Sequence, residues 1–130
     1  MREIFISILI IITIITFGIV VQNHLEKTSG ELINDLQELK QELIQTKENT
    51  NMYKAKEKLE KTINHWENNK KIWSTIIMHE ELDNIEVSLL ALKANVENEK
   101  LEEALVELEK SIFWIGHIME KEDLKLKNIF

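Results

Sequence analysis

The sequence predicts an all-α protein in which an N-terminal transmembrane helix is followed by an antiparallel bundle of three or four helices. The chain has no proline and only three glycines, so little interrupts its helix-forming residues. Apolar residues recur at steps of three and four, which is the period of one helix face. The start of the chain differs, because it holds an uncharged apolar run long enough to span a bilayer.

The apolar run begins at Ile4 and ends at Val21, and only hydroxyl residues and Gly18 interrupt it. As a helix it would extend about 27 Å, close to the thickness of a hydrocarbon core. A cleaved signal peptide is the alternative, but such a peptide has a shorter run and small residues before the cut, which Val20 to His24 do not provide. We therefore predict an uncleaved anchor over residues 1–27, in contact with the lipid bilayer from Ile4 to Val21.

Charges beside the run predict its orientation. Arg2 precedes it, whereas Glu26 and Lys27 cancel each other after it. Since basic residues favour the cytoplasmic side, we expect a single-pass protein of the cell membrane with a cytoplasmic N-terminus and an extracytoplasmic body.

The body carries the entire net charge of −7, because Arg2 and Glu3 cancel ahead of the run. An acidic body argues against nucleic acid as a partner, since phosphate backbones repel it. The absence of cysteine excludes disulfides, thiolate catalysis and cysteine-ligated zinc.

A short linker is predicted at residues 28–30, where Thr28, Ser29 and Gly30 combine helix-ending and helix-capping residue types. The bundle is predicted over residues 31–123. Its first helix covers residues 31–48 and ends where an Asn-Thr-Asn cluster favours a turn. A second helix is expected to begin near Met52.

The predicted packing centre is the stretch of residues 66–92, which contains Trp66 and Trp73. One apolar stripe begins there and comprises Met78, Leu82, Ile85, Leu89, Leu92 and Val96. The stripe that includes the two tryptophans has a different phase on a helix. The stretch therefore bends near His79, breaks at Asn68 and Asn69, or meets two packing partners in succession.

The last predicted helix begins at Lys100 and ends at about Glu122. Residues 112–119 within it are apolar on almost every face, so we expect this segment, with Trp114, at the centre of the bundle. Residues 124–130 form an apolar tail that includes Ile129 and Phe130. We expect the tail to fold back onto the bundle, because free exposure of these side chains is unfavourable; docking onto a partner is the alternative.

The two halves of the body share a faint repeat with an offset of 49 residues. Ala55 corresponds to Ala104, Ile63 to Ile112, and Glu48-Asn49 to Glu97-Asn98. The repeat predicts two similar αα-hairpins, with chance similarity between lysine- and glutamate-rich helices as the alternative.

A row of ionisable residues is the sharpest candidate site. His79, Asp83 and Glu86 lie at i, i+4 and i+7, on one face of a helix. The favoured interpretation is structural: His79 hydrogen-bonds Asp83 or a backbone carbonyl and locks the bend. The alternative is a Zn²⁺ or Mn²⁺ site completed by His117 or His65.

No catalytic residue, cofactor or bound metal is predicted, since phosphate-binding, nucleophile and zinc-protease motifs are all missing from the sequence. The residues expected to act in structure or interaction are Trp66, Trp73, His79, Leu82, Asp83, Ile85, Trp114, Ile129 and Phe130.

Several local features together suggest a family. They are the apolar N-terminal run, the Trp66/Trp73 pair, the run His-Glu-Glu-Leu-Asp-Asn-Ile-Glu that begins at His79, and the segment Lys-Asn-Ile-Phe that ends at Phe130. In these features the chain resembles a family of short single-span proteins of unknown function from spore-forming, clostridia-like bacteria. Its members tend to be encoded beside a multi-pass membrane protein of the YetF class, which implies an accessory role at the membrane and a link to sporulation.

The function expected from these observations is non-enzymatic: an extracytoplasmic accessory protein that packs against a multi-pass membrane protein. The alternative is a sensor-like bundle that binds a small ligand or a metal ion between its helices. A homo-oligomer is also open, because regular apolar stripes suit intermolecular coiled coils.

Overall fold

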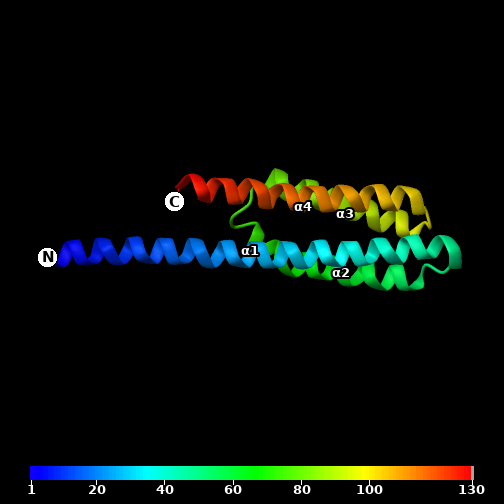
Figure 1. Cartoon of the computed structure of the whole chain (residues 1–130), viewed down its shortest axis with the longest axis horizontal. Coiled ribbons are helices and arrows are strands. Elements are labelled where there is room, and N and C mark those ends of the chain that lie inside the picture. Colours follow the sequence, from blue (N-terminus) through cyan, green and yellow to red (C-terminus); the bar gives the residue numbers. More distant parts are fainter. Residues whose placement is uncertain (130) are drawn as a thin grey trace.

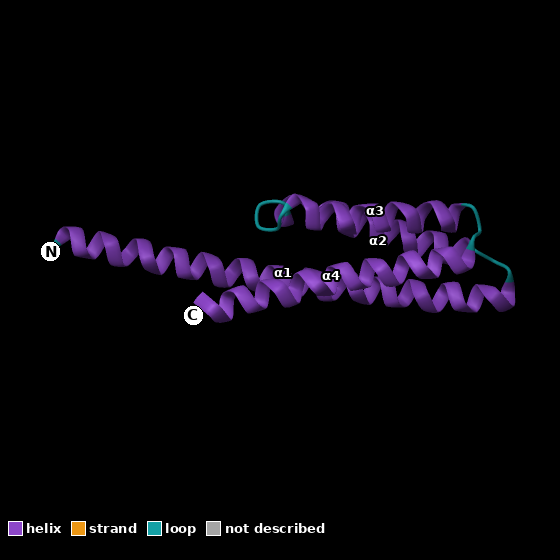
Figure 2. Cartoon of the chain, turned by 90° about the horizontal axis from the view of Figure 1, so that it is seen from above, coloured by secondary structure: helices purple, strands orange, loops and turns teal. Residues whose placement is uncertain are grey.

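A computed structural model describes residues 1–129, apart from the side chains of Leu126 and Ile129. It contains four helices: α1 (Arg2–Asn49), α2 (Tyr53–Trp73), α3 (His79–Glu97) and α4 (Leu101–Ile129). Figures 1 and 2 show them running alternately in opposite directions, with α1 and α2 as one hairpin, α3 and α4 as the second, and α1 beside α4. The all-helical prediction is confirmed. The predicted interaction residue Phe130 lies outside the described residues.

The core is built from one apolar stripe on each helix. Trp66 and Trp73 are buried and meet edge to face, with ring centroids 5.7 Å apart. The fully buried leucines and isoleucines around them are Leu25, Leu32, Leu36, Leu39, Leu43, Ile85, Leu89, Leu92, Leu108 and Ile115. Since each such side chain stabilises the fold by about 1.5–3 kcal/mol, these stripes explain why the four helices associate.

The linker predicted at residues 28–30 is wrong, because α1 passes through it without a break. The Thr28 hydroxyl donates to the carbonyl of His24 at 2.9 Å, and the Ser29 hydroxyl donates to that of Glu26 at 2.9 Å. Hydroxyl side chains can cap a helix or bond back within it, and here they do the latter. The predicted anchor and the first bundle helix are therefore one continuous helix of 48 residues.

The break in residues 66–92 lies between Trp73 and His79. Helix α2 continues through Asn68 and Asn69, and the chain then turns over residues 74–78. His79 is the exposed first residue of α3 and takes part in none of the side-chain hydrogen bonds seen among the described residues, so it does not lock this bend. Met78, predicted to belong to the buried stripe, is 57% exposed because it precedes the first turn of α3.

The two hairpins agree with the predicted repeat. The chain adopts a left-handed backbone at Thr50, where φ is 53°, and at Glu99, where φ is 58°. These two positions are separated by the predicted offset and lie in the α1–α2 and α3–α4 connections. Ala55 and Ala104 are both completely buried where each returning helix begins, which allows close approach of the two helices.

Two predictions about α4 are wrong. Residues 112–119 are not uniformly central, because Phe113 is 60% exposed and Trp114 is half-buried. A bundle helix buries only one stripe, so some side chains of an all-round apolar segment must face outward. Residues 124–129 do not fold back but continue α4 as helix, and Leu124 is 60% exposed.

Replacement of Trp73 by alanine should lower the free energy of unfolding by about 3–5 kcal/mol, since it leaves a large cavity in the core. Denaturation of the full chain in detergent, followed by helical circular dichroism, measures this loss. Tyr53→Ala is the control, because Tyr53 is 73% exposed and its loss should change stability by less than about 0.5 kcal/mol. Equal effects of the two substitutions would contradict a core role for Trp73.

Candidate functional site

The predicted row of ionisable residues does not form one site. His79 and Asp83 are exposed, whereas Glu86 is half-buried and faces α2. There the Glu86 carboxylate pairs with Lys70 and accepts a hydrogen bond from the Trp66 indole at 3.4 Å. Glu86 therefore connects α3 to α2 rather than joining His79 and Asp83.

The ion pair with Glu86 keeps Lys70 protonated to a higher pH than an isolated lysine, because it raises the pKa of Lys70. The hydrogen bond to Glu86 raises the pKa of Lys70 above its ordinary value of 10.5. A raised folded-state pKa stabilises the fold at pH values below the ordinary pKa, and this contribution is lost as the pH rises through the folded value. At neutral pH Lys70 is therefore charged and can pair with Glu86 across α2 and α3.

His117 does not complete a metal shell. It lies exposed on α4 and stacks on the Phe113 ring, with centroids 5.8 Å apart. His65 belongs to a different group of contacts on α2, described below. Among residues 1–129, no three histidine, aspartate or glutamate side chains converge in a way that could hold a metal ion.

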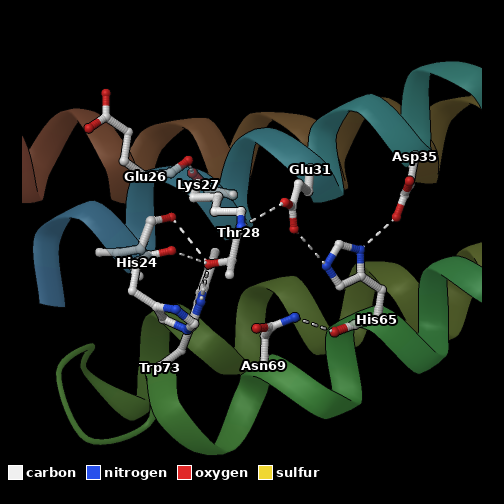
Figure 3. Close-up of polar contacts among 11 residues, drawn as sticks. His24, Glu26, Lys27, Thr28, Glu31, Asp35, His65, Asn69 and Trp73 are labelled. Atoms are coloured by element: carbon white, nitrogen blue, oxygen red, sulfur yellow. Dashed lines mark hydrogen bonds and ion pairs between the residues drawn. The ribbon is translucent and has the colours of Figure 1, made fainter. Parts of the chain in front are cut away.

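A polar cluster joins α1 to α2 where α1 enters the bundle (Figure 3); we call Thr28, Glu31, Asp35, His65 and Trp73 the junction cluster. The Trp73 indole N–H donates to the Thr28 hydroxyl at 3.0 Å, and both side chains are buried. Because the Thr28 hydroxyl itself donates to the His24 carbonyl, its hydrogen-bonding capacity is used in both directions. This contact fixes the C-terminal end of α2 against the middle of α1, where α1 enters the bundle.

His65 continues the junction cluster one to two turns further along α1. Its Nδ1 lies 2.7 Å from an Asp35 carboxylate oxygen, and its Nε2 lies 3.4 Å from a Glu31 oxygen (Figure 3). The protonated ring can donate to both carboxylates, whereas the neutral ring can donate to only one. The arrangement is suited to tying two helices together, and sequence patterns did not reveal it because the partners are 30 or more residues apart.

The geometry can be compared with known proteins. A family model described as a domain of unknown function, DUF4363, matches residues 19–129. The chain belongs to this family. No curated protein and no solved structure matches the chain. The DUF4363 match begins inside the last turn of the apolar run and covers the residues that form the packed helices of this chain.

Four large apolar side chains are exposed on the second hairpin at positions where the first hairpin has polar residues. On α3, Val87 is 65% and Leu90 is 57% exposed; on α4, Val106 is 54% and Phe113 is 60% exposed. At the repeat offset, the corresponding positions of the first hairpin are Glu38, Gln41, Glu57 and Asn64, which are all exposed. The hairpin fold therefore does not require apolar residues at these positions.

Helix periodicity alone does not reveal this apolar surface, because residues 112–119 are apolar on almost every face and place Phe113 in the expected core. The repeat does reveal it, because it pairs each of these exposed apolar residues with a polar residue of the first hairpin. We call Val87, Leu90, Val106 and Phe113 the outer apolar surface. On α4, Val106 and Phe113 line one shallow hollow together with Leu105, and exposed apolar groups that lie together mark contact surfaces more often than isolated ones do.

The junction cluster can be tested by replacing Thr28 with valine, which has the same shape but no hydroxyl. The buried Trp73 N–H would lose its acceptor, so the free energy of unfolding should fall by about 1–3 kcal/mol. Thr28→Ser keeps the hydroxyl and is the matched control, with a smaller loss expected. Thermal denaturation of the full chain in detergent distinguishes them, and equal losses would show that the hydrogen bond contributes nothing.

Proposed function

We propose that this protein is a membrane-anchored, extracytoplasmic helical accessory protein, without enzymatic activity, that packs against a membrane protein partner. The observation that carries the proposal is the construction of α1. One helix begins with an apolar segment in whose most apolar stretch no residue is buried, and ends with a buried core stripe.

The exposed segment supports anchoring. An apolar helix in the core of a soluble protein would be covered by the rest of the chain, yet no part of the most apolar stretch of α1 is buried. Exposure of this much contiguous apolar surface to water is unfavourable, whereas its contact with the hydrocarbon core of a bilayer is favourable. The absence of a break between this segment and the core favours an anchor that stays attached to the body.

The outer apolar surface supports a protein partner. Phe113 packs against Trp114 and His117 to form an exposed aromatic group, with Phe113 and Trp114 centroids 5.3 Å apart. Large aromatic side chains dominate the energy of many protein interfaces. A multi-pass membrane protein fits as the partner, because the anchor would keep this surface at the same membrane as such a protein; the family resemblance implies the same class of partner and a link to sporulation.

A sensor-like bundle is less well supported. The hollows found along the bundle lie on its surface, and charged side chains such as Lys54, Glu57 and Lys61 line one of them. Such surfaces differ from the concave, mostly apolar pockets that bind small ligands.

The proposed topology has the N-terminus inside the cell and the bundle outside. Protease added to intact protoplasts should digest the bundle and leave a protected fragment that contains the apolar run. Lysed protoplasts serve as the control for total digestion. A bundle that resists protease until lysis would contradict this orientation, and a mature chain that begins near Asn23 would contradict the anchor.

The proposed contact surface can be tested with Phe113→Glu, which places a charge where an apolar contact is expected. Recovery of a multi-pass partner with the tagged full chain, from membranes in mild detergent, should fall about tenfold or more, since a lost aromatic anchor costs about 2 kcal/mol. Tyr53→Glu is the matched control, because Tyr53 is also exposed but lies in the first hairpin, on α2. Unchanged recovery with Phe113→Glu would refute this surface as the interface.

A further inference from the structure

We propose that the last turns of α4, residues 124–129, form a second contact with the bilayer at its interface. This inference rests on the proposed anchoring through α1. It assigns a lipid surface to a segment that neither the core nor the outer apolar surface uses.

The position of this segment follows from the pairing of α1 with α4. Lys40 on α1 pairs with Glu109 on α4, and Lys47 pairs with Glu102. Moving seven residues forward along α1 therefore corresponds to moving seven residues backward along α4. Both helices rise by about 1.5 Å per residue. If this register continues to the end of α4, Leu124 lies beside Leu25 along the helix axis, and Asn128 lies beside Val21.

Exposure along α1 agrees with this register. Residues 1–17, 19 and 20 are exposed, whereas Gly18, Val21 and Gln22 are half-buried. The exposed part of α1 therefore ends within one helical turn of the height that the register assigns to the end of α4. Because Val21 is the last residue of the apolar run, the same height is where the bilayer surface must lie if the run spans the membrane.

The end of α4 also projects past the rest of the bundle. In Figures 1 and 2 it extends further toward the N-terminus than the connection between α2 and α3. Only α1 accompanies it there, so its sides are open to the surroundings. Leu124 is correspondingly 60% exposed, and Leu126 and Ile129 add two further apolar residues to the sequence of this segment.

The lysines in this segment are arranged as an interface requires. The Lys125 ammonium bonds Glu122 at 2.9 Å, and the Lys127 ammonium lies 2.8 Å from Asp123. Both carboxylates belong to the preceding turn, on the side of the bundle and away from the apolar run. The charges are thus neutralised and directed toward water, while the lysine stems remain at the apolar level. Apolar residues beside charges that point away from the membrane are typical of interfacial helices.

Two attachment points would fix the bundle in a way that one cannot. A body held by α1 alone can tilt relative to the membrane as that helix tilts. A second contact through the end of α4 restricts this tilt, because α4 runs beside α1. The outer apolar surface would then be held at a set height above the membrane.

Site-directed spin labels can test this contact, and each engineered cysteine is unique because the chain has no cysteine. The labelled positions are Leu124→Cys, Asn128→Cys, Ile12→Cys in the apolar run, and Phe113→Cys on the outer apolar surface. The full chain is reconstituted in vesicles of phosphatidylcholine alone, so that lipid charge does not contribute. Collision with oxygen, which concentrates in lipid, is compared with collision with a water-soluble nickel chelate.

The ratio of oxygen accessibility to nickel accessibility should be highest at Ile12. At Asn128 the ratio should be severalfold higher than at Phe113. At Leu124 it should lie between the ratios at Asn128 and Phe113. Labels at Leu124 and Asn128 that are as accessible to nickel as Phe113, while Ile12 is protected, would overturn the second contact and leave the anchor intact; the segment would then be open to a protein partner. A nickel-accessible label at Ile12 would instead overturn the anchor, and the second contact with it. Circular dichroism of each variant confirms that the helices remain folded.

Discussion

The continuity of α1 is the constraint on which the rest of the structure depends. One helix passes from an exposed apolar segment to a completely buried stripe that contains Leu32, Leu36 and Leu43. A helix has no soft joint, so the orientation of the bundle relative to the apolar segment is set by α1 itself. The Trp73–Thr28 hydrogen bond contributes to this constraint, because it attaches the C-terminal end of α2 to α1 where α1 enters the bundle.

Helix periodicity made most of the fold predictable. Leu82, Ile85 and Val96 are buried as their spacing predicts, because a stripe at steps of three and four has only one way to meet a neighbouring helix. The joints were harder to predict. Thr28 and Ser29 carry the hydroxyl groups that favour a helix cap, and the same groups bond back to carbonyls inside a continuous helix. Local sequence does not distinguish the two outcomes; packing of Thr28 against Trp73 decides between them.

The candidate sites were less predictable than the fold, because they depend on which helices meet. The row of His79, Asp83 and Glu86 shares one helix face, but only Glu86 reaches a neighbouring helix. His65 gains its partners from α1, across a separation that no local pattern encodes. The exposure of Phe113 could not be predicted from its local sequence either. Its segment is apolar all round, and only the bundle geometry determines which of those faces stays exposed.

Comparison of the two hairpins separates what the fold needs from what it does not. Buried positions keep their character across the repeat: Ala55 and Ala104, Thr62 and Ser111, and Trp66 and Ile115 are all buried. Exposed positions diverge, because Glu57 corresponds to Val106 and Asn64 to Phe113. Packing constrains the first group, whereas solvent exposure alone would permit polar residues in the second. The apolar residues that the second hairpin exposes therefore need another explanation, and a surface that another protein covers supplies one.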